Sequence, residues 1–139
     1  MTLPSEAEWE KAAHGKDGRI YHWGNIPDPD VANYAYTGIG TTSAVGCFPC
    51  GASSYGVEEL SGNVWEWTRS LWGAYPYLSE RLARMKREDL QAPEDASRVL
   101  RGGAFGNVDH SVHCASRLRD DARNVYSDIG CRVALVGPP

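Results

Sequence analysis

Cysteine and histidine pairs are the first residues in this sequence whose types and spacing could do chemistry. Cys47 and Cys50 are separated by two residues, and so are His110 and His113, with Cys114 directly following. Thiolate sulfur and imidazole nitrogen are ligands that zinc takes in tetrahedral sites, and both spacings are admissible. A zinc site is one interpretation, and a Cys47–Cys50 redox pair is a second. The third is that these residues occupy turns and the surface without any metal.

The cysteine count leaves the cellular compartment open. The chain has four cysteines, of which Cys131 is the last, and four permit three complete pairings as well as free thiols. No apolar run approaches the roughly 20 residues that span a bilayer, and the first residues lack the basic and apolar regions of a signal peptide. We therefore expect neither a signal peptide nor a transmembrane segment in this chain.

Length and composition predict one loop-rich domain over residues 1–139. Of the 139 residues, 42% are hydrophobic and 23% are charged, which suits a single modest core. The 15 Gly, 8 Pro, 5 Trp and 7 Tyr indicate many turns held by aromatic anchors. A net charge of −4 provides no field for a polyanion, so we expect no nonspecific nucleic-acid binding.

Local patterns predict a few short elements that must position any site. Residues 5–8, S-E-A-E, form a capping box for a helix that runs to about Ala13 and ends at Gly15. Residues 16–56 contain too many turn signals for regular elements. Residues 60–68 alternate as a strand does, with Glu66 and Thr68 on one side and Trp67 on the other. Further strands are expected at 98–101 and 129–136. Residues 79–90 are expected to be a solvated excursion, in which Leu82, Met85 and Leu90 form a narrow apolar stripe on a helix or belong to a mobile insertion.

Several motifs, in order along the chain, resemble those of the formylglycine-generating enzyme and sulfatase-modifying factor family. They are L-P-S-E-A-E-W-E at 3–10, Y-G at 55–56, S-G-N-V-W-E-W at 61–67, R-V-L-R-G-G at 98–103 and I-G-C-R-V at 129–133. The resemblance implies an α+β, C-type lectin-like fold that is loop-rich, with a small antiparallel sheet and one or two short helices. Family domains usually carry a further stretch before the first of these motifs.

The resemblance also bears on whether the chain is an enzyme. The family's oxidases bind copper through two cysteines just after an R-G-G-S motif, and soft thiolates suit Cu(I). Asn107 and Asp109 stand roughly where those cysteines belong, so we expect no copper and no oxidase activity. Cys114 matches a structural cysteine of the family, whose usual partner position holds Ala13. The alternative function is a formylglycine-generating-type sulfatase-modifying oxidase or a degenerate regulatory relative.

A structural calcium ion is a further expectation from the resemblance. The family's ligands carry over onto Glu59, Gly62, Val64 and Glu66, where mixed carboxylate and carbonyl oxygens suit a hard cation. Glu59 departs from the family pattern, which has Asp or Asn there. The alternative is that Glu66 is a buried acid paired with an arginine such as Arg101 or Arg132.

Residues 104–128 lie between two well-kept motifs and carry a chemically miscellaneous set of side chains. This arrangement resembles the variable proteins of diversity-generating retroelements, in which adenine-directed mutagenesis rewrites Asn codons near the C-terminus. The resemblance implies a non-enzymatic scaffold that binds a protein or other macromolecular ligand, not nucleic acid or membrane. An ordinary solvated loop is the alternative.

Within this segment we expect Tyr126 and His110 to be the contact anchors, because aromatic side chains on rigid loops suit recognition. The complete set of predicted ligand-binding residues is Gly106, Asn107, Val108, Asp109, His110, Ser111, His113, Ser116, Leu118, Asp120, Asn124, Val125, Tyr126, Ser127 and Asp128.

Overall fold

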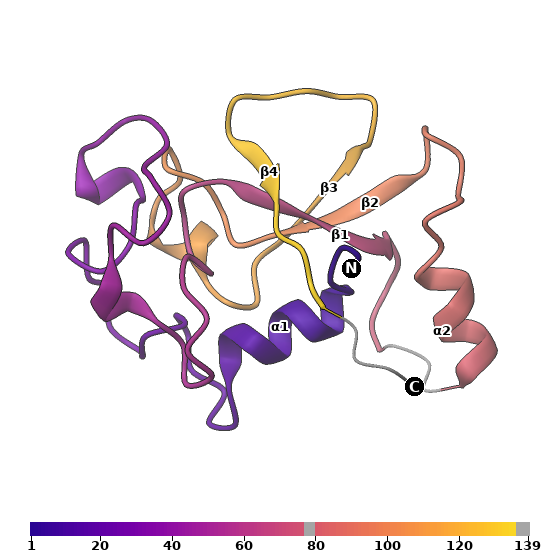
Figure 1. Cartoon of the computed structure of the whole chain (residues 1–139), viewed down its shortest axis with the longest axis horizontal. Helices are drawn as coiled ribbons and strands as arrows, with labels where there is room; N and C mark the ends of the chain where they lie inside the picture. Colours follow the sequence, from indigo (N-terminus) through magenta and orange to yellow (C-terminus); the bar gives the residue numbers. More distant parts are fainter. Residues whose placement is uncertain (77–79, 136–139) are drawn as a thin grey trace.

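The protein folds into a small twisted sheet flanked by a helix and long irregular loops (Figure 1). The structure is a computed structural model that describes residues 1–76 and 80–135. The elements in chain order are α1 (Glu6–His14), the 3-10 turns η1 (Ala35–Thr37) and η2 (Pro49–Gly51), β1 (Trp65–Leu71), α2 (Arg81–Arg87), β2 (Ser97–Arg101), the 3-10 turn η3 (Asp109–Val112), β3 (Arg117–Asp121) and β4 (Ile129–Cys131).

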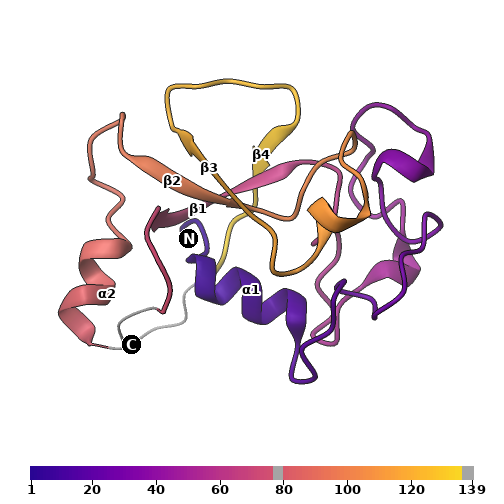
Figure 2. The same ribbon diagram turned by 180° about the vertical axis from the view of Figure 1, so that it is seen from behind.

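The sheet is mixed, with strand order β3-β2-β1-β4. β2 pairs antiparallel with both β1 and β3, whereas β4 pairs parallel with β1. The predicted loop-rich α+β class with two short helices is confirmed, but the sheet is not antiparallel throughout. β3 and β4 follow each other in the chain yet lie at opposite edges, so residues 122–128 must cross the end of the sheet. Figures 1 and 2 show this connection on one side of the sheet and α1 on the other.

Helix α1 begins and ends as the sequence predicts. The Ser5 hydroxyl accepts a hydrogen bond from the Glu8 amide at 3.2 Å, and the Ser5 amide donates to the Glu8 carboxylate at 2.8 Å. These two bonds satisfy amides that the first helical turn cannot pair. Gly15 ends the helix with a φ of +68°. The buried face of α1 carries Trp9 and Ala13 toward β1 and β2.

The alternation predicted for β1 is confirmed, and its two faces differ in character. Trp65 and Trp67 pack on one side with Leu100 of β2. On the other side, Thr68 is buried and donates its hydroxyl hydrogen to the Val99 carbonyl oxygen at 2.9 Å. Ser70 accepts a hydrogen bond from the Glu6 amide at 2.9 Å. Helix α1 is therefore joined to the sheet by buried hydrogen bonds as well as by apolar contacts.

The core is divided into small clusters, as expected for a chain with many loops. One cluster consists of Trp9, Ala13, Leu60 and Cys114, so Ala13 and Cys114 share one part of the core, and Cys114 is a free thiol. A second cluster holds the long N-terminal loops with buried aromatic residues and consists of Tyr21, Ala32, Tyr34 and Val112. Turn-rich segments are thus fixed by large side chains rather than by hydrogen-bonded ladders.

Two strand predictions need correction, whereas the charged excursion takes the helical form that its apolar stripe allowed. The charged excursion contains a regular helix, α2. None of the residues of α2 is buried, which fits the solvation expected for the excursion. Residue 79 lies outside the described residues. The last strand ends at Cys131 instead of continuing to 136, and only an isolated bridge joins Ala134 to Thr2; residue 136 also lies outside. β3 was not predicted, because its sequence R-L-R-D-D has no apolar alternation and the strand forms by pairing with β2.

Candidate functional site

None of the fifteen predicted ligand-binding residues is buried in the core. Each is exposed or half-exposed, whereas the intervening Val112 and Cys114 have 0% of their surface exposed. Buried side chains therefore anchor the segment from within, while the predicted residues face outward. An exposed surface on a fixed backbone is what recognition by side chains requires.

The structure does not bring the predicted residues together in one place. Residues 106–116 surround η3, while residues 122–128, here called the arch, cross from β3 to β4. Figures 1 and 2 show η3 and the arch well separated, on different sides of the sheet. The expected anchors are divided in the same way, because His110 lies in η3 and Tyr126 lies in the arch. The two anchors thus belong to two surfaces rather than to a single one.

The region around η3 has a rigid backbone. The Asn107 side-chain oxygen accepts a hydrogen bond from the Ala104 amide at 2.8 Å, and the Asn107 carbonyl accepts one from the Ala35 amide at 2.9 Å. Asp109 uses its carboxylate to accept the His110 amide at 2.8 Å. The two positions that the resemblance assigns to copper-binding thiolates are therefore filled by oxygen atoms that stabilise a turn.

Two further contacts fix the segment that leads from η3 to β3. Arg101 is fully buried, and its guanidinium donates hydrogen bonds to the carbonyl oxygens of Cys114 at 2.8 Å and Ser116 at 2.9 Å. His113 packs the edge of its ring on Tyr21, with 5.0 Å between ring centres. Burial lowers the pKa of His113, so this ring is neutral at neutral pH.

The arch is tied down at both ends and exposed between them. Asn124 donates a side-chain hydrogen bond to the Asp120 carboxylate at 2.7 Å, and the Asp128 carbonyl accepts the Trp65 amide at 2.8 Å. Between these points, 91% of the Val125 surface and 52% of the Tyr126 surface are exposed. Exposed aromatic and aliphatic side chains held between fixed ends are suited to contact with a partner.

The four predicted calcium ligands lie in one short stretch at the start of β1, and Glu66 is held by an arginine. Arg132 donates to both carboxylate oxygens of Glu66, and Trp9 donates its ring N–H to the same group at 2.6 Å. Arg132 also donates to the Glu59 carbonyl at 2.8 Å. The alternative expected for Glu66, a buried acid paired with Arg132, is therefore what the structure shows.

The same loop also holds an acidic oxygen without a partner. One carboxylate oxygen of Glu59 is buried and has no hydrogen-bond partner among the described residues, and burial raises the pKa of this carboxyl. The backbone makes tight left-handed turns here, with a φ of +59° at Glu59 and +82° at Gly62. A Cβ on Gly62 would meet the Asn33 carbonyl oxygen at 2.1 Å, so only glycine allows this close approach. An orphaned, buried carboxylate oxygen beside such turns is a position that a cation would stabilise.

The cysteines do not assemble with the histidines into a metal site. All four cysteines are free, with Cys47, Cys50 and Cys131 exposed and Cys114 buried. Across residues 1–76 and 80–135, no three histidine, cysteine or acidic side chains come together in a way that could hold a metal ion. Burial raises the pKa of Cys114 to about 12, so it is a thiol rather than a thiolate at neutral pH.

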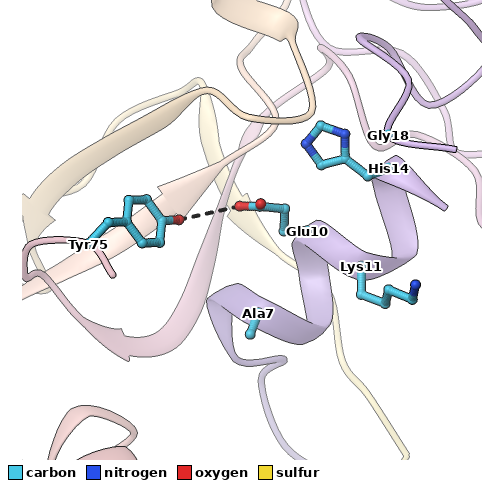
Figure 3. Close-up of a pocket in the computed structure, with 6 residues that line it drawn as sticks. All are labelled: Ala7, Glu10, Lys11, His14, Gly18 and Tyr75. Atoms are coloured by element: carbon cyan, nitrogen blue, oxygen red, sulfur yellow. Dashed lines mark hydrogen bonds between the residues drawn. The ribbon is translucent and has the colours of Figure 1, made fainter. Parts of the chain in front are cut away.

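Concave sites that no sequence pattern indicated lie around α1, and no residue of 104–128 lines them. A cavity of about 450 Å³ is lined in part by Glu10, His14 and Tyr75. Figure 3 shows the Tyr75 hydroxyl directed at the Glu10 carboxylate, with Lys11 on another side of the helix. A second cavity, of about 850 Å³, lies between the end of β1 and α2. None of the fifteen predicted residues lines either cavity.

Comparison with known proteins places these motifs and this geometry in a family. The profile of the sulfatase-modifying factor enzyme 1-like domain matches residues 1–136. The chain belongs to this family. The family includes both formylglycine-generating enzymes and inactive relatives of them. Membership alone therefore does not decide between catalysis and binding.

Three relatives illustrate the range of the sulfatase-modifying factor family. The formylglycine-generating enzyme of Thermomonospora curvata is 36% identical over 139 residues, covering 87% of this chain and 43% of that protein. The inactive C-alpha-formylglycine-generating enzyme 2 of Bos taurus is 31% identical over 148 residues, covering 95% of this chain and 43% of that protein. Serine/threonine-protein kinase Pkn1 of Chlamydia trachomatis is 36% identical over 133 residues, covering 95% of this chain and 20% of that protein. The chain thus spans less than half the length of each.

Solved structures confirm the fold. The chain superposes on Treponema denticola variable protein 1 with a TM-score of 0.71 and 25% identity, covering 93% of this chain and 45% of that one. It superposes on PvdO from Pseudomonas aeruginosa with a TM-score of 0.70 and 24% identity, covering 94% of this chain and 50% of that one. The first of these relates the chain to the variable proteins that residues 104–128 resemble.

The described helices are too short or too polar to cross a bilayer.

Proposed function

We propose that this chain is a non-enzymatic binding scaffold that displays variable side chains between residues 104 and 128 on two surfaces, the arch and the region around η3, as the variable proteins of diversity-generating retroelements do. Its partner is a protein or another macromolecule, bound by side chains on the arch and around η3. The proposal assigns no role to nucleic acid or to a membrane. The observation that carries it is the division of the segment into buried anchors and outward-facing, chemically varied residues.

The chemistry near the R-G-G motif supports binding rather than oxidation. The family's copper-dependent oxidases use paired thiolates, which neither Asn107 nor Asp109 can supply, and one side-chain oxygen of each already accepts a backbone amide in the turn. Cys114 lies in the core as a protonated thiol. No step of the family's oxygen chemistry can therefore be assigned to these side chains.

The shape of the segment supports a macromolecular partner. None of the fifteen predicted residues lines the cavities of about 450, 590 and 850 Å³, and each is exposed or half-exposed, which suits contact with a large partner. Exchange of outward side chains leaves Val112, Cys114 and Arg101 in place beneath them. Such a surface can change its specificity without losing its fold.

A turnover assay tests the absence of catalysis. The protein is incubated in air with Cu(I) and a Cys-x-Pro-x-Arg peptide, and mass spectrometry follows loss of the thiol and gain of the aldehyde. The formylglycine-generating enzyme of Thermomonospora curvata serves as the active control. We expect conversion by the control and none by this chain. Copper-dependent turnover by this chain would overturn the non-enzymatic assignment.

The neighbouring DNA tests the diversification. We expect a reverse-transcriptase gene close by and a near-copy of the stretch that encodes residues 101–133, with differences confined to adenines. The codons of the fifteen predicted ligand-binding residues should differ between the two copies. The codons of the buried Val112 and Arg101 should be the same in both. A locus without the reverse transcriptase, or with differences spread evenly over buried and exposed positions, contradicts this part of the proposal.

We further propose a structural calcium ion held by Glu59, Glu66 and the carbonyl oxygens of Gly62 and Val64. The support is the buried Glu59 oxygen that has no partner among the described residues. Glu66 would share its carboxylate between the ion and Arg132, because each carboxylate oxygen can accept more than one contact. The ion would stabilise the turns that precede β1 and would take no part in chemistry.

A further inference from the structure

The second cavity is a concave space that is separate from the recognition surface and from the calcium loop. It measures about 850 Å³ and lies between the end of β1, the following loop and α2, with lining residues that include Leu71, Trp72, Tyr75, Ala83, Arg84 and Lys86. This volume is within the range of sites that bind small molecules. Its walls combine apolar and aromatic surface with cations from a single helix.

The aromatic wall of the cavity is held in place from behind. The Arg117 guanidinium lies 4.4 Å from the Trp72 ring centre and 4.2 Å from the Tyr75 ring centre. The single Tyr75 hydroxyl hydrogen is shared between the carboxylates of Glu6, at 3.0 Å, and Glu10, at 3.3 Å, and Figure 3 shows the contact with Glu10. Rings fixed by such contacts lose little freedom when a ligand packs on them, which favours binding.

The charge of α2 is opposite to that of the whole chain. Its seven residues, R-L-A-R-M-K-R, include four cations and no acid, whereas the chain carries a net charge of −4. Arg87 uses its guanidinium to donate to the carbonyl oxygens of Gly73 and Ala74. Glu88 is the one acid among the described residues that line the cavity, and it is paired with Arg69 at 3.0 Å.

Two cations at the cavity remain available for a ligand. Arg84 and Lys86 are exposed and line the cavity, and neither side chain makes a hydrogen bond or ion pair within residues 1–76 and 80–135. Uncompensated cations beside an apolar, aromatic wall complement a molecule that has an anionic group and an apolar body. A cation would be repelled, and a neutral molecule would gain only the apolar contact.

We propose that this cavity binds a small organic anion. The apolar or aromatic body packs against Trp72, Tyr75 and Leu71, and its carboxylate, sulfonate or phosphate group pairs with either of the two cations, Arg84 or Lys86, which are two positions apart on α2. The proposal is independent of the recognition surface at residues 104–128, because no residue of that surface lines the cavity.

The first test uses 1-anilinonaphthalene-8-sulfonate as the probe, with fluorescence titration of the whole chain. We expect one saturable site and a dissociation constant raised about tenfold by Arg84→Glu with Lys86→Glu, since each exposed charge contributes modestly. Arg81→Glu is the matched control, because Arg81 is on the same helix and does not line the cavity. An equal weakening by the control, or no weakening by the double variant, overturns the proposal.

The second test asks whether charge contributes to binding in addition to apolar contact. It also asks whether the probe binds inside the cavity or elsewhere on the surface. The neutral probe N-phenyl-1-naphthylamine should bind at least several-fold more weakly than the sulfonate. Ala83→Trp, which fills the cavity, should abolish binding, whereas Leu82→Trp should not, since Leu82 is 73% exposed and lies outside the cavity. Circular dichroism checks that each variant folds. Equal binding of both probes, or retention of binding by folded Ala83→Trp, is the contrary result.

Discussion

His22 shows how strongly one buried side chain can respond to its surroundings. Only 1% of its surface is exposed, and its ring lies edge-on to Trp23 with 4.9 Å between ring centres. Burial, assisted by the positive charge of Arg132, lowers the pKa of His22 to about 3. The folded protein therefore keeps His22 neutral at pH values where the unfolded chain would protonate it.

This difference predicts a loss of stability in acid. The folded pKa is below the unfolded value of 6.5, so the contribution of His22 is complete above pH 6.5 and declines as the pH falls toward 3. Because of His22, we expect the free energy of unfolding to be about 2 kcal/mol lower at pH 5 than at pH 7. Urea denaturation at the two pH values measures it.

The variants that check this prediction are His22→Phe and His110→Gln. The first should reduce the difference between pH 7 and pH 5, because no titrating group remains in that core position. The second is the control for the loss of an exposed histidine, since the His110 side chain is 75% exposed. Equal pH dependence in the wild type and folded His22→Phe would show that other groups control acid stability.

Glu59 leads to a prediction for the proposed calcium ion. Burial raises the pKa of Glu59, so its charged form is disfavoured until a cation approaches. We expect calcium well above its dissociation constant to raise the melting temperature by about 5 °C over EDTA. Glu59→Gln should remove this rise, and Glu58→Gln should retain it. A rise that survives in Glu59→Gln would place the ion elsewhere.

At the scale of elements, the turn after β2 positions η3. Gly103 adopts a φ of +74°, and a Cβ there would meet Val112 Cγ1 at 2.6 Å and the Ser111 carbonyl oxygen at 2.8 Å. Val112 is fully buried, so the glycine lets η3 dock closely enough to anchor the segment. The R-V-L-R-G-G motif at 98–103 thus acts by letting the backbone at Gly103 approach the backbone of η3 closely.

Replacing this glycine should therefore damage the fold. We expect Gly103→Ala to lower the free energy of unfolding by at least about 2 kcal/mol, from left-handed strain and from the clash with Val112. Gly106→Ala is the matched control, because a Cβ added there would have no atom within 4 Å and its φ is not in the left-handed range. Denaturant unfolding measures both variants. Similar losses in the two would mean that the turn is less constrained than its close contacts indicate.

At the scale of the whole molecule, one buried acid joins elements that are distant in sequence. Glu6 of α1 is fully buried and pairs with Arg117 of β3, with Arg101 of β2 at 3.5 Å and with Arg87 of α2 at 3.6 Å. The Tyr75 hydroxyl donates to the same carboxylate. Helices and sheet are therefore connected through a single side chain, whose loss would leave several cations uncompensated.

This network predicts a large effect of a small change. We expect Glu6→Gln, which keeps the shape of the side chain, to cost about 3 kcal/mol of unfolding free energy. Asp17→Asn, which removes an exposed acid paired with Arg19, should cost no more than about 1 kcal/mol. Thermal and urea unfolding compare them. A cost for Glu6→Gln as small as that for Asp17→Asn would show that solvent screens the network.

The sequence alone determined the features that depend on local chemistry. The capping box of α1, the alternation of β1 and the family motifs could each be recognised within a few residues, because turns and periodicity are written locally. The absence of thiolates at Asn107 and Asp109 needed no structure either. For Glu66 the sequence offered a calcium ion or an arginine such as Arg101 or Arg132, and tertiary packing places Arg132 against it.

The tertiary structure decided where these features meet. β3 forms only because β2 lies beside it, and the parallel pairing of β4 with β1 sends the arch across the end of the sheet, away from η3. The cavity against α2 combines residues from β1, the following loop and a helix with no buried residue, which no periodicity could reveal. Contacts such as Glu6 with Arg117, 111 positions apart, depend on the chain's path in space.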